Sequence, residues 1–235
     1  GGTNSMGLAI NRTMNNRSKI ISVAAKICGL KEPAAIHAAV LGGASYVGLV
    51  FYPPSPRAVT PVLARALATL VPPAVKKVGL FVDPDDDFLV TVLAQVPLDL
   101  IQLHGRESPE RVAWIKALTK LPVLKAIKVA KGADMDMAKA YDGVANMLLF
   151  DAKAPEDMAD ALPGGNALVF DWELLKGRHW RRPWMLSGGL DAGNVAQAVT
   201  ISGARAVDIS SGVESARGVK DPAAIKAFLD AVMAL

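Results

Sequence analysis

Eight short runs rich in Val, Ile and Leu recur along this chain at intervals of roughly 20 to 30 residues, with helix-like segments between them. Such runs predict buried strands, and their alternation with helices predicts βα units in a parallel sheet. The predicted strands cover residues 24–28, 46–51, 76–82, 98–103, 123–129, 146–151, 183–187 and 206–209. A closed α/β barrel has eight strands, so the pattern predicts a single (β/α)8 barrel with eight parallel strands.

Capping residues support the same register. Thr60, Ser108 and Asp221 each precede a proline. That order places a capping side chain before a proline at the first helical position, so we expect helices to begin at these points. A doubly wound open sheet also repeats βα units, but the sequence contains no glycine-rich nucleotide fingerprint after its first strand. The strand number therefore favours the closed barrel.

Length and composition permit one large core. The 235 residues fit a single α/β barrel, and 51% of them are apolar against 20% charged. The one cysteine excludes an intramolecular disulfide. No apolar run has the length of a membrane span and no signal-peptide core precedes the first strand, so we expect a cytoplasmic protein without a membrane partner.

Most of the net charge of +4 lies before the first strand. Arg12, Arg17 and Lys19 stand there without an acidic residue. The remainder is close to neutral, which disfavours a nucleic-acid partner. We interpret residues 1–19 as a disordered leader or a cloning remnant, and residues 20–235 as the catalytic barrel domain.

Four chemically useful side chains fall at or just after predicted strand ends, which form the catalytic face of an α/β barrel. They are Cys28, Arg57, His104 and Asp151. We expect Cys28 and Asp151 to face each other across the barrel mouth as an acid/base pair. A cysteine base needs nearby N–H groups or a cation that favour its thiolate, and a carboxyl acid needs a pKa raised by burial.

Each of these side chains also has an ordinary structural interpretation. A lone Cys28 is more often a small buried hydrophobe, and Asp151 could be a helix cap or an ion-pair partner. Arg57 is either a carboxylate-binding group or a surface arginine. His104 fits a hydrogen-bonded structural role better than a catalytic one. No spacing of Cys, His, Asp or Glu matches a metal site, so we expect no metal.

The ends of the seventh and eighth predicted strands resemble a phosphate site. Loops after these strands often bind phosphate in α/β barrels. Glycines let the backbone approach an anion, and a short helix near Ser211 would add its positive end. Ordinary turn glycines are the alternative. The predicted phosphate-binding residues are Gly188, Gly189, Ser210, Ser211 and Gly212.

One connection is longer than the others. It follows Asp151 and runs over residues 152–170 before a helix is expected to resume after Phe170-Asp171-Trp172. A long loop at a barrel mouth is more often functional than decorative, and its glycines could let it close over a ligand. A disordered insertion is the alternative.

Taken together in chain order, the motifs resemble the phosphoribosylanthranilate isomerase family. The matching segments are Lys26-Ile27-Cys28-Gly29-Leu30, Gly43-Ala44 with Gly48 and Phe51, Ser55-Pro56-Arg57, Gly79 with Phe81-Val82, Gln102-Leu103-His104-Gly105, Phe150-Asp151, Phe170-Asp171-Trp172, Ser187-Gly188-Gly189-Leu190 with Asn194-Val195, and Asp208-Ile209-Ser210-Ser211-Gly212-Val213-Glu214 with Gly218, Lys220 and Asp221.

The resemblance implies a cofactor-independent barrel enzyme of tryptophan biosynthesis. Its reaction is the Amadori rearrangement of N-(5-phosphoribosyl)anthranilate, a small phosphoribosyl substrate, to 1-(2-carboxyphenylamino)-1-deoxyribulose 5-phosphate. By the same resemblance, Asp151 is the general acid, Cys28 the general base and Arg57 the ligand of the anthranilate carboxylate. Asp208 and His104 support the pocket. The expected state is a monomer or a homodimer.

The sequence departs from the family pattern at two places, and two alternative functions have to be weighed. Residues 164–167 read Gly-Gly-Asn-Ala, where the family usually has Gly-Gly-Thr-Gly. The extension before Ala24 is longer than in most members, which fits a cloning remnant, a native tail or the stub of a fusion. A histidine-pathway or dual-substrate aminoaldose isomerase would resemble this barrel but carries Asp where Cys28 stands. A non-catalytic phosphate-binding barrel is disfavoured by Cys28 and Asp151.

Overall fold

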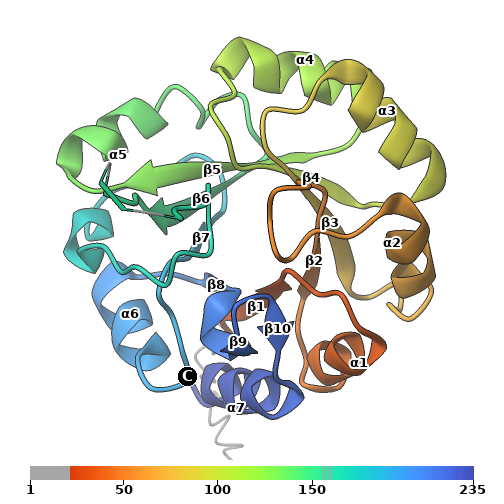
Figure 1. Ribbon diagram of the computed structural model, residues 1–235. Coiled ribbons are helices and arrows are strands. Elements are labelled where there is room, and N and C mark those ends of the chain that lie inside the picture. The colour runs from red at the N-terminus through yellow and green to blue at the C-terminus, as the bar shows by residue number, and fades with distance from the viewer. Residues whose placement is uncertain (1–21, 156, 159) are drawn as a thin grey trace, which may run out of the picture.

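The computed structural model describes residues 22–155, 157–158 and 160–235, and its eight strands close into one barrel (Figure 1). Every strand pairs in parallel with both neighbours, and β1 pairs with β8 to complete the ring. The prediction of a (β/α)8 barrel is confirmed. The interpretation of residues 1–19 as a leader lies outside the described residues. The strands are β1 Ala24–Cys28, β2 Tyr46–Val50, β3 Lys76–Phe81, β4 Leu100–Leu103, β5 Val123–Val129, β6 Met147–Ala152, β7 Trp184–Leu186 and β8 Ala206–Ile209.

Helices pack around the outside of this ring, as Figure 1 shows. The three expected helix starts are present, because the side chains of Thr60, Ser108 and Asp221 accept hydrogen bonds from backbone N–H groups in the first turn of α2, α4 and α7. The helices are α1 Pro33–Leu41, α2 Pro61–Ala68, α3 Asp86–Gln95, α4 Pro109–Thr119, α5 Gly132–Ala138, α6 Val195–Ser202 and α7 Pro222–Met233. None of the helices in the described ranges is long and apolar enough to cross a membrane.

The connections after β6 and β8 depart from a plain βα repeat. The helix expected after Trp172 is only a four-residue 3-10 helix, η1 Trp172–Leu175. The chain after β8 forms a second 3-10 helix, η2 Ser211–Val213, and a small antiparallel hairpin of β9 Glu214–Ala216 and β10 Val219–Lys220. These two connections supply a large part of the barrel mouth.

Both apolar and polar side chains are buried inside the barrel. Leu124, Ala126, Leu149 and Met185 form a compact apolar cluster on β5, β6 and β7. Charged and amide side chains are also buried, among them Lys26 and Gln102 at 0% exposure and Asp208 at 5%. Side chains two residues apart on a strand share a face. Cys28, two residues after Lys26, therefore points into the same interior at the carboxyl end of β1.

Candidate active site

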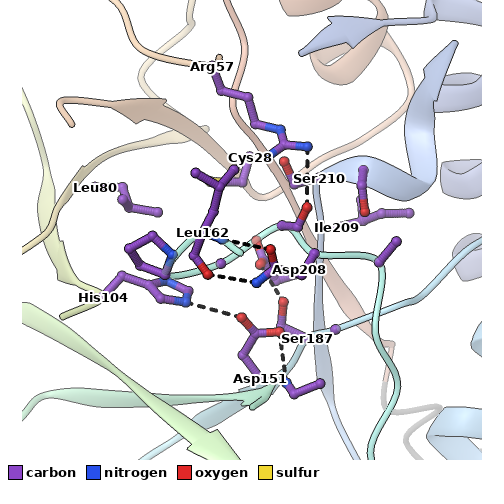
Figure 2. A pocket seen from close by; sticks show the side chains of 18 of the residues that line it. Cys28, Arg57, Leu80, His104, Asp151, Leu162, Ser187, Asp208, Ile209 and Ser210 are labelled. Carbon is purple, nitrogen blue, oxygen red and sulfur yellow. Dashed lines mark hydrogen bonds and ion pairs between the residues drawn. The ribbon is translucent and has the colours of Figure 1, made fainter. Parts of the chain in front are cut away.

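All of the site residues predicted from the sequence line one pocket at the carboxyl ends of the strands (Figure 2). Cys28, His104 and Asp151 come from or directly follow β1, β4 and β6, while Arg57 comes from the connection after β2. The remaining predicted residues reach the pocket from the segments that end β7 and β8, namely Gly188, Gly189, Asp208, Ser210, Ser211 and Gly212. The barrel thus brings together groups as far apart in the chain as Cys28 and Gly212.

Cys28 is the last residue of β1 and is 5% exposed. Gly48 on β2 is its partner in the parallel ladder, and a Cβ at position 48 would lie 2.7 Å from Cys28 Sγ. Only glycine leaves room for the thiol there, because real Cβ atoms do not approach another atom so closely. Gly29 has a φ of 82°, which turns the chain out of the barrel directly after the cysteine.

A buried ion pair lies below Cys28. Lys26 Nζ is 2.8 Å from Asp208 Oδ1, and Ser187 Oγ donates to Asp208 Oδ2 over 2.8 Å. Burial disfavours the ammonium, yet the Asp208 carboxylate and the neighbouring Cys28 outweigh this penalty, so the pKa of Lys26 is raised above its ordinary value. Asp208 lies in the pocket wall, where Lys26 and Ser187 hold its carboxylate. Lys26 was not predicted as a site residue, although a lysine inside a buried strand is itself a signal of a paired charge.

Asp151 lies at the end of a chain of hydrogen bonds. Its Oδ1 accepts from the backbone N–H of Ala152 over 2.9 Å, and its Oδ2 is 3.1 Å from His104 Nε2. Gln102 Nε2 is 3.0 Å from the other ring nitrogen, His104 Nδ1. The amide nitrogen can only donate, so in this amide orientation Nδ1 accepts and His104 Nε2 carries the hydrogen that it donates to Asp151. Gln102 is a site residue that was not predicted.

Arg57 is buried at 4% exposure, and its guanidinium is held by a carboxylate. Its Nε and Nη2 each donate to Glu214 over 2.8 Å, and Nη2 also lies 3.4 Å from the carbonyl of Gly165. Lys220 Nζ donates to the same carboxylate over 2.6 Å and to Ser210 Oγ over 3.2 Å. Burial would raise the pKa of Glu214, but hydrogen bonds from Arg57 and Lys220 lower it to about 2.

The loops after β7 and β8 pack closely together. Gly188 and Gly189 have φ values of 94° and 63°, which other residues rarely adopt. Asn194 Nδ2 donates to the carbonyl of Gly189 over 2.8 Å and fixes the turn. A Cβ at Gly212 would overlap the carbonyl oxygen of Leu190. These glycines bring two stretches of backbone to the pocket wall, as a phosphate site requires.

The described part of the long β6 connection lies on this pocket, with residues 162–168 in its wall. A Cβ at Gly164 would come within 2.7 Å of His104 Nε2, so the backbone there runs directly over the catalytic face. Asn166 Oδ1 accepts from the N–H of Leu162 over 2.8 Å, and Asn166 Nδ2 donates to the carbonyl of Leu162 over 2.7 Å. The asparagine at this position thus ties the segment into a small closed loop. Ala167 has a φ of 56°, a conformation that favours glycine.

Within the described ranges, no group of three or more His, Cys, Asp or Glu side chains is arranged to hold a metal ion.

Comparison with known proteins gives one answer. Residues 25–231 match the family model described as N-(5'phosphoribosyl)anthranilate (PRA) isomerase. The N-(5'-phosphoribosyl)anthranilate isomerase of Rhodospirillum centenum is 62% identical over 213 residues, which cover 91% of this chain and 99% of that protein.

Solved structures agree with that match. The crystal structure of phosphoribosyl anthranilate isomerase from Thermotoga maritima superposes with a TM-score of 0.80 at 37% identity, covering 91% of this chain and all of that one. A crystal structure of phosphoribosyl anthranilate isomerase in complex with reduced 1-(o-carboxyphenylamino)-1-deoxyribulose 5-phosphate superposes with a TM-score of 0.77 at 35% identity, with the same coverage.

Proposed function

Since this chain belongs to the N-(5'-phosphoribosyl)anthranilate isomerase family, we propose how its side chains divide the work of that reaction. The protein is an isomerase of tryptophan biosynthesis, and it converts N-(5'-phosphoribosyl)anthranilate to 1-(2-carboxyphenylamino)-1-deoxyribulose 5-phosphate. Substrate and product are isomers. C2 of the sugar is oxidised from alcohol to ketone while C1 is reduced, so a proton leaves C2 and a proton is delivered to C1. The observation that carries the assignment is that Cys28 and Asp151 line the same pocket.

Asp151 is the general acid of the proposal. It protonates the ring oxygen of the ribose, the C1–O bond breaks, and the nitrogen lone pair forms the Schiff base. The carboxyl group is buried at the pocket wall, and His104 and the Ala152 N–H fix its orientation. Such fixing matters because proton transfer requires the two heavy atoms to lie within hydrogen-bond distance.

Cys28 is the general base, and it removes the proton from C2 of the Schiff base to give the enolamine. Loss of the enol O–H proton to the Asp151 carboxylate and return of the proton from Cys28 to C1 then give the ketone and regenerate both groups. Positive charge beside a cysteine is the setting in which proteins use its thiolate. Three cations are buried here, Lys26, Arg57 and Lys220. Burial disfavours their charged forms and is the largest single influence on the pKa of each, in the direction that lowers it. Lys26 lies two residues before Cys28 on the same face of β1, and a Cβ at Gly29, the residue after Cys28, would come within 2.8 Å of Arg57 Cδ and 3.1 Å of Lys220 Nζ, so the three cations lie near the thiol.

The two ends of the substrate carry negative charge, and the pocket offers a partner for each. Arg57 binds the anthranilate carboxylate through its Nη1 amino group, since its Nε and Nη2 already donate to Glu214. Backbone and hydroxyl groups of the β7 and β8 loops bind the phosphate, namely Gly188, Gly189, Ser210, Ser211 and Gly212. No step of this scheme calls on a cofactor or a metal.

The test is turnover of the purified protein on N-(5'-phosphoribosyl)anthranilate with a chelator and without added nucleotide. We expect wild-type protein to consume the substrate, and we expect Cys28→Ala and Asp151→Asn to lower kcat by at least about a thousandfold while the far-ultraviolet circular dichroism stays unchanged. Asp136→Asn, at an exposed carboxylate, serves as the matched control. Near-normal turnover by either site variant would remove that residue from the acid/base pair.

The histidine-pathway aminoaldose is the substrate that separates the remaining alternatives. We expect no turnover of it, because Cys28 stands where that enzyme carries an aspartate. Measurable turnover would identify a dual-substrate isomerase.

We also propose a cytoplasmic location, since the substrate and product are metabolites of amino-acid biosynthesis, and a monomeric or homodimeric state. Cell fractionation and sedimentation equilibrium test these two proposals.

A further inference from the structure

A buried carboxylate joins the two ends of the pocket. Glu214 accepts two hydrogen bonds from Arg57 and one from Lys220, and Lys220 donates a further one to Ser210 Oγ. The side chains of Arg57, Glu214 and Lys220 are 5%, 3% and 4% exposed. These four residues, here called the Glu214 network, connect the proposed carboxylate ligand to the proposed phosphate loop through one continuous set of contacts.

We propose that Glu214 and Lys220 are positioning residues, which hold Arg57 and Ser210 in the orientations that bind the carboxylate and the phosphate of the substrate. The proposal rests on the function assigned above to Arg57 and Ser210. Neither Glu214 nor Lys220 needs to touch the substrate for this role.

The geometry of the arginine favours this role. Glu214 takes the Nε–H and one Nη2–H of the guanidinium, which fixes its plane. Among the residues that the structure describes, Nη1 makes no hydrogen bond, and Arg57 lines the pocket. The carboxylate therefore orients the guanidinium while leaving its Nη1 amino group for a ligand.

The charges of the Glu214 network also support a positioning role for Glu214. Two buried cations share one carboxylate, so the network keeps a net positive charge that an anionic substrate can neutralise. Burial lowers the pKa of Lys220 and the Glu214 carboxylate partly offsets this, whereas the Arg57 guanidinium lowers it further. Without Glu214, Arg57 would lose the two hydrogen bonds that fix its guanidinium and would be repelled by Lys220 in a site of low dielectric, so Arg57 would move, whereas Lys220 would keep its contact with Ser210.

Gly29 shows how tightly the network is packed against the base. A Cβ at position 29 would come within 2.8 Å of Arg57 Cδ, 3.1 Å of Lys220 Nζ and 3.2 Å of Ser210 Oγ. The residue that follows Cys28 is thus in contact range of three of the four network members. A shift of the network would displace both anchors relative to the general base, although no member takes part in proton transfer.

The decisive test measures binding by calorimetry with two ligands that differ at one group. The first is reduced 1-(o-carboxyphenylamino)-1-deoxyribulose 5-phosphate, and the second is its phenylamino counterpart without the carboxylate. We expect Glu214→Gln to weaken the first ligand by about tenfold or more and the second by less than about threefold, since misplacement of Arg57 affects only the carboxylate. Equal weakening of both ligands would indicate a merely structural Glu214 and overturn the proposal.

Lys220→Met tests the other arm of the network. We expect it to weaken both ligands by a similar factor of about five, because it acts through Ser210 on the phosphate that both ligands carry. Lys226→Met, at an exposed lysine on α7, is the matched control and should change neither affinity. A Lys220→Met protein that binds both ligands as tightly as wild type would overturn the role of Lys220.

A conservative variant keeps the result interpretable. Glu214→Asp keeps the charge with a shorter reach, so it should restore part of the selective loss even if Glu214→Gln is poorly folded. Failure of that variant to recover any discrimination between the ligands would contradict the proposal. Because the readout is binding, it is independent of the acid/base assignment, which fails instead if Cys28→Ala or Asp151→Asn still turns over.

Discussion

His104 Nε2 lies 3.1 Å from Asp151 Oδ2 inside the barrel, and the opposite nitrogen of the same ring is held by Gln102 over 3.0 Å. The imidazole therefore reaches the proposed acid in one tautomer. This contact agrees with the expectation that His104 is a hydrogen-bonded residue. It also gives Asp151 the partner that its alternative, structural interpretation requires. Gln102 therefore acts on the orientation of Asp151 through His104, although Gln102 does not itself contact Asp151.

Gln102→Leu tests that dependence. The substitution removes the donor to His104 Nδ1, so either tautomer becomes accessible and the hydrogen bond to Asp151 is no longer enforced. We expect kcat to fall about three- to tenfold with a displaced pH–rate profile and with the KM little changed. Gln95→Leu, on the outside of α3, is the control. A profile that superposes on that of the wild type would show that Gln102 does not act on the acid.

Gly48→Ala tests the space reserved for the thiol. The added methyl group would lie 2.7 Å from Cys28 Sγ and 3.1 Å from Cys28 Cα, so the side chain must rotate or the strand must shift. We expect a kcat loss of about tenfold or more and a loss of about 1 to 3 kcal/mol in the free energy of unfolding. Gly132→Ala, where the nearest atom is 3.8 Å away, should leave both unchanged.

The pKa of Glu214 makes stability depend on pH. Its folded-state pKa is depressed from 4.5 to about 2, so its contribution is fully present above the unfolded value and is lost as the pH falls toward 2. We expect the unfolding free energy of the wild type to drop by roughly 2 to 3 kcal/mol more than that of Glu214→Gln between pH 6 and pH 2. Parallel urea-denaturation curves at both pH values would contradict this linkage.

Ala167→Gly tests the backbone of the long connection. A residue with a Cβ is strained at a φ of 56°, and glycine is not. We expect the variant to gain about 1 kcal/mol in the free energy of unfolding, whereas Ala154→Gly, in the same connection but without a positive φ, should lose stability. A loss of stability in Ala167→Gly would mean that the gain in unfolded-state entropy outweighs the relief of strain.

The barrel could be predicted from the sequence because each strand has a local sequence pattern. An apolar run between a glycine or proline and a capping residue predicts its own limits, and β1, β5 and β8 have the predicted bounds. β4 begins two residues later than expected, at Leu100. The cause is a turn after Val96, where the N–H of Leu98 donates to the carbonyl of Val96 instead of joining the ladder.

The position of the site could also be predicted, from the places where the strands end. Once strand ends are known, a side chain at a strand end must lie at the barrel mouth, which is why Cys28, His104 and Asp151 could be expected together. Arg57 and the glycine turns follow those ends within a few residues. All of them line one pocket.

The groups that support these residues could not be predicted in the same way. Lys26 and Asp208 are 182 residues apart, and Arg57 and Glu214 are 157 apart. No local pattern encodes such a pair, since each charge would look unfavourable alone and becomes stable only when the closed barrel presents its partner. The same holds for Asn166, whose two hydrogen bonds to Leu162 depend on the shape of the loop.

The chain contains one cysteine, and that cysteine lines the pocket. Any thiol-directed reagent consumed by the native protein is therefore consumed at this pocket. Stoichiometric titration with such a reagent counts pockets directly, and slower labelling in the presence of product would report the fraction of pockets that are occupied.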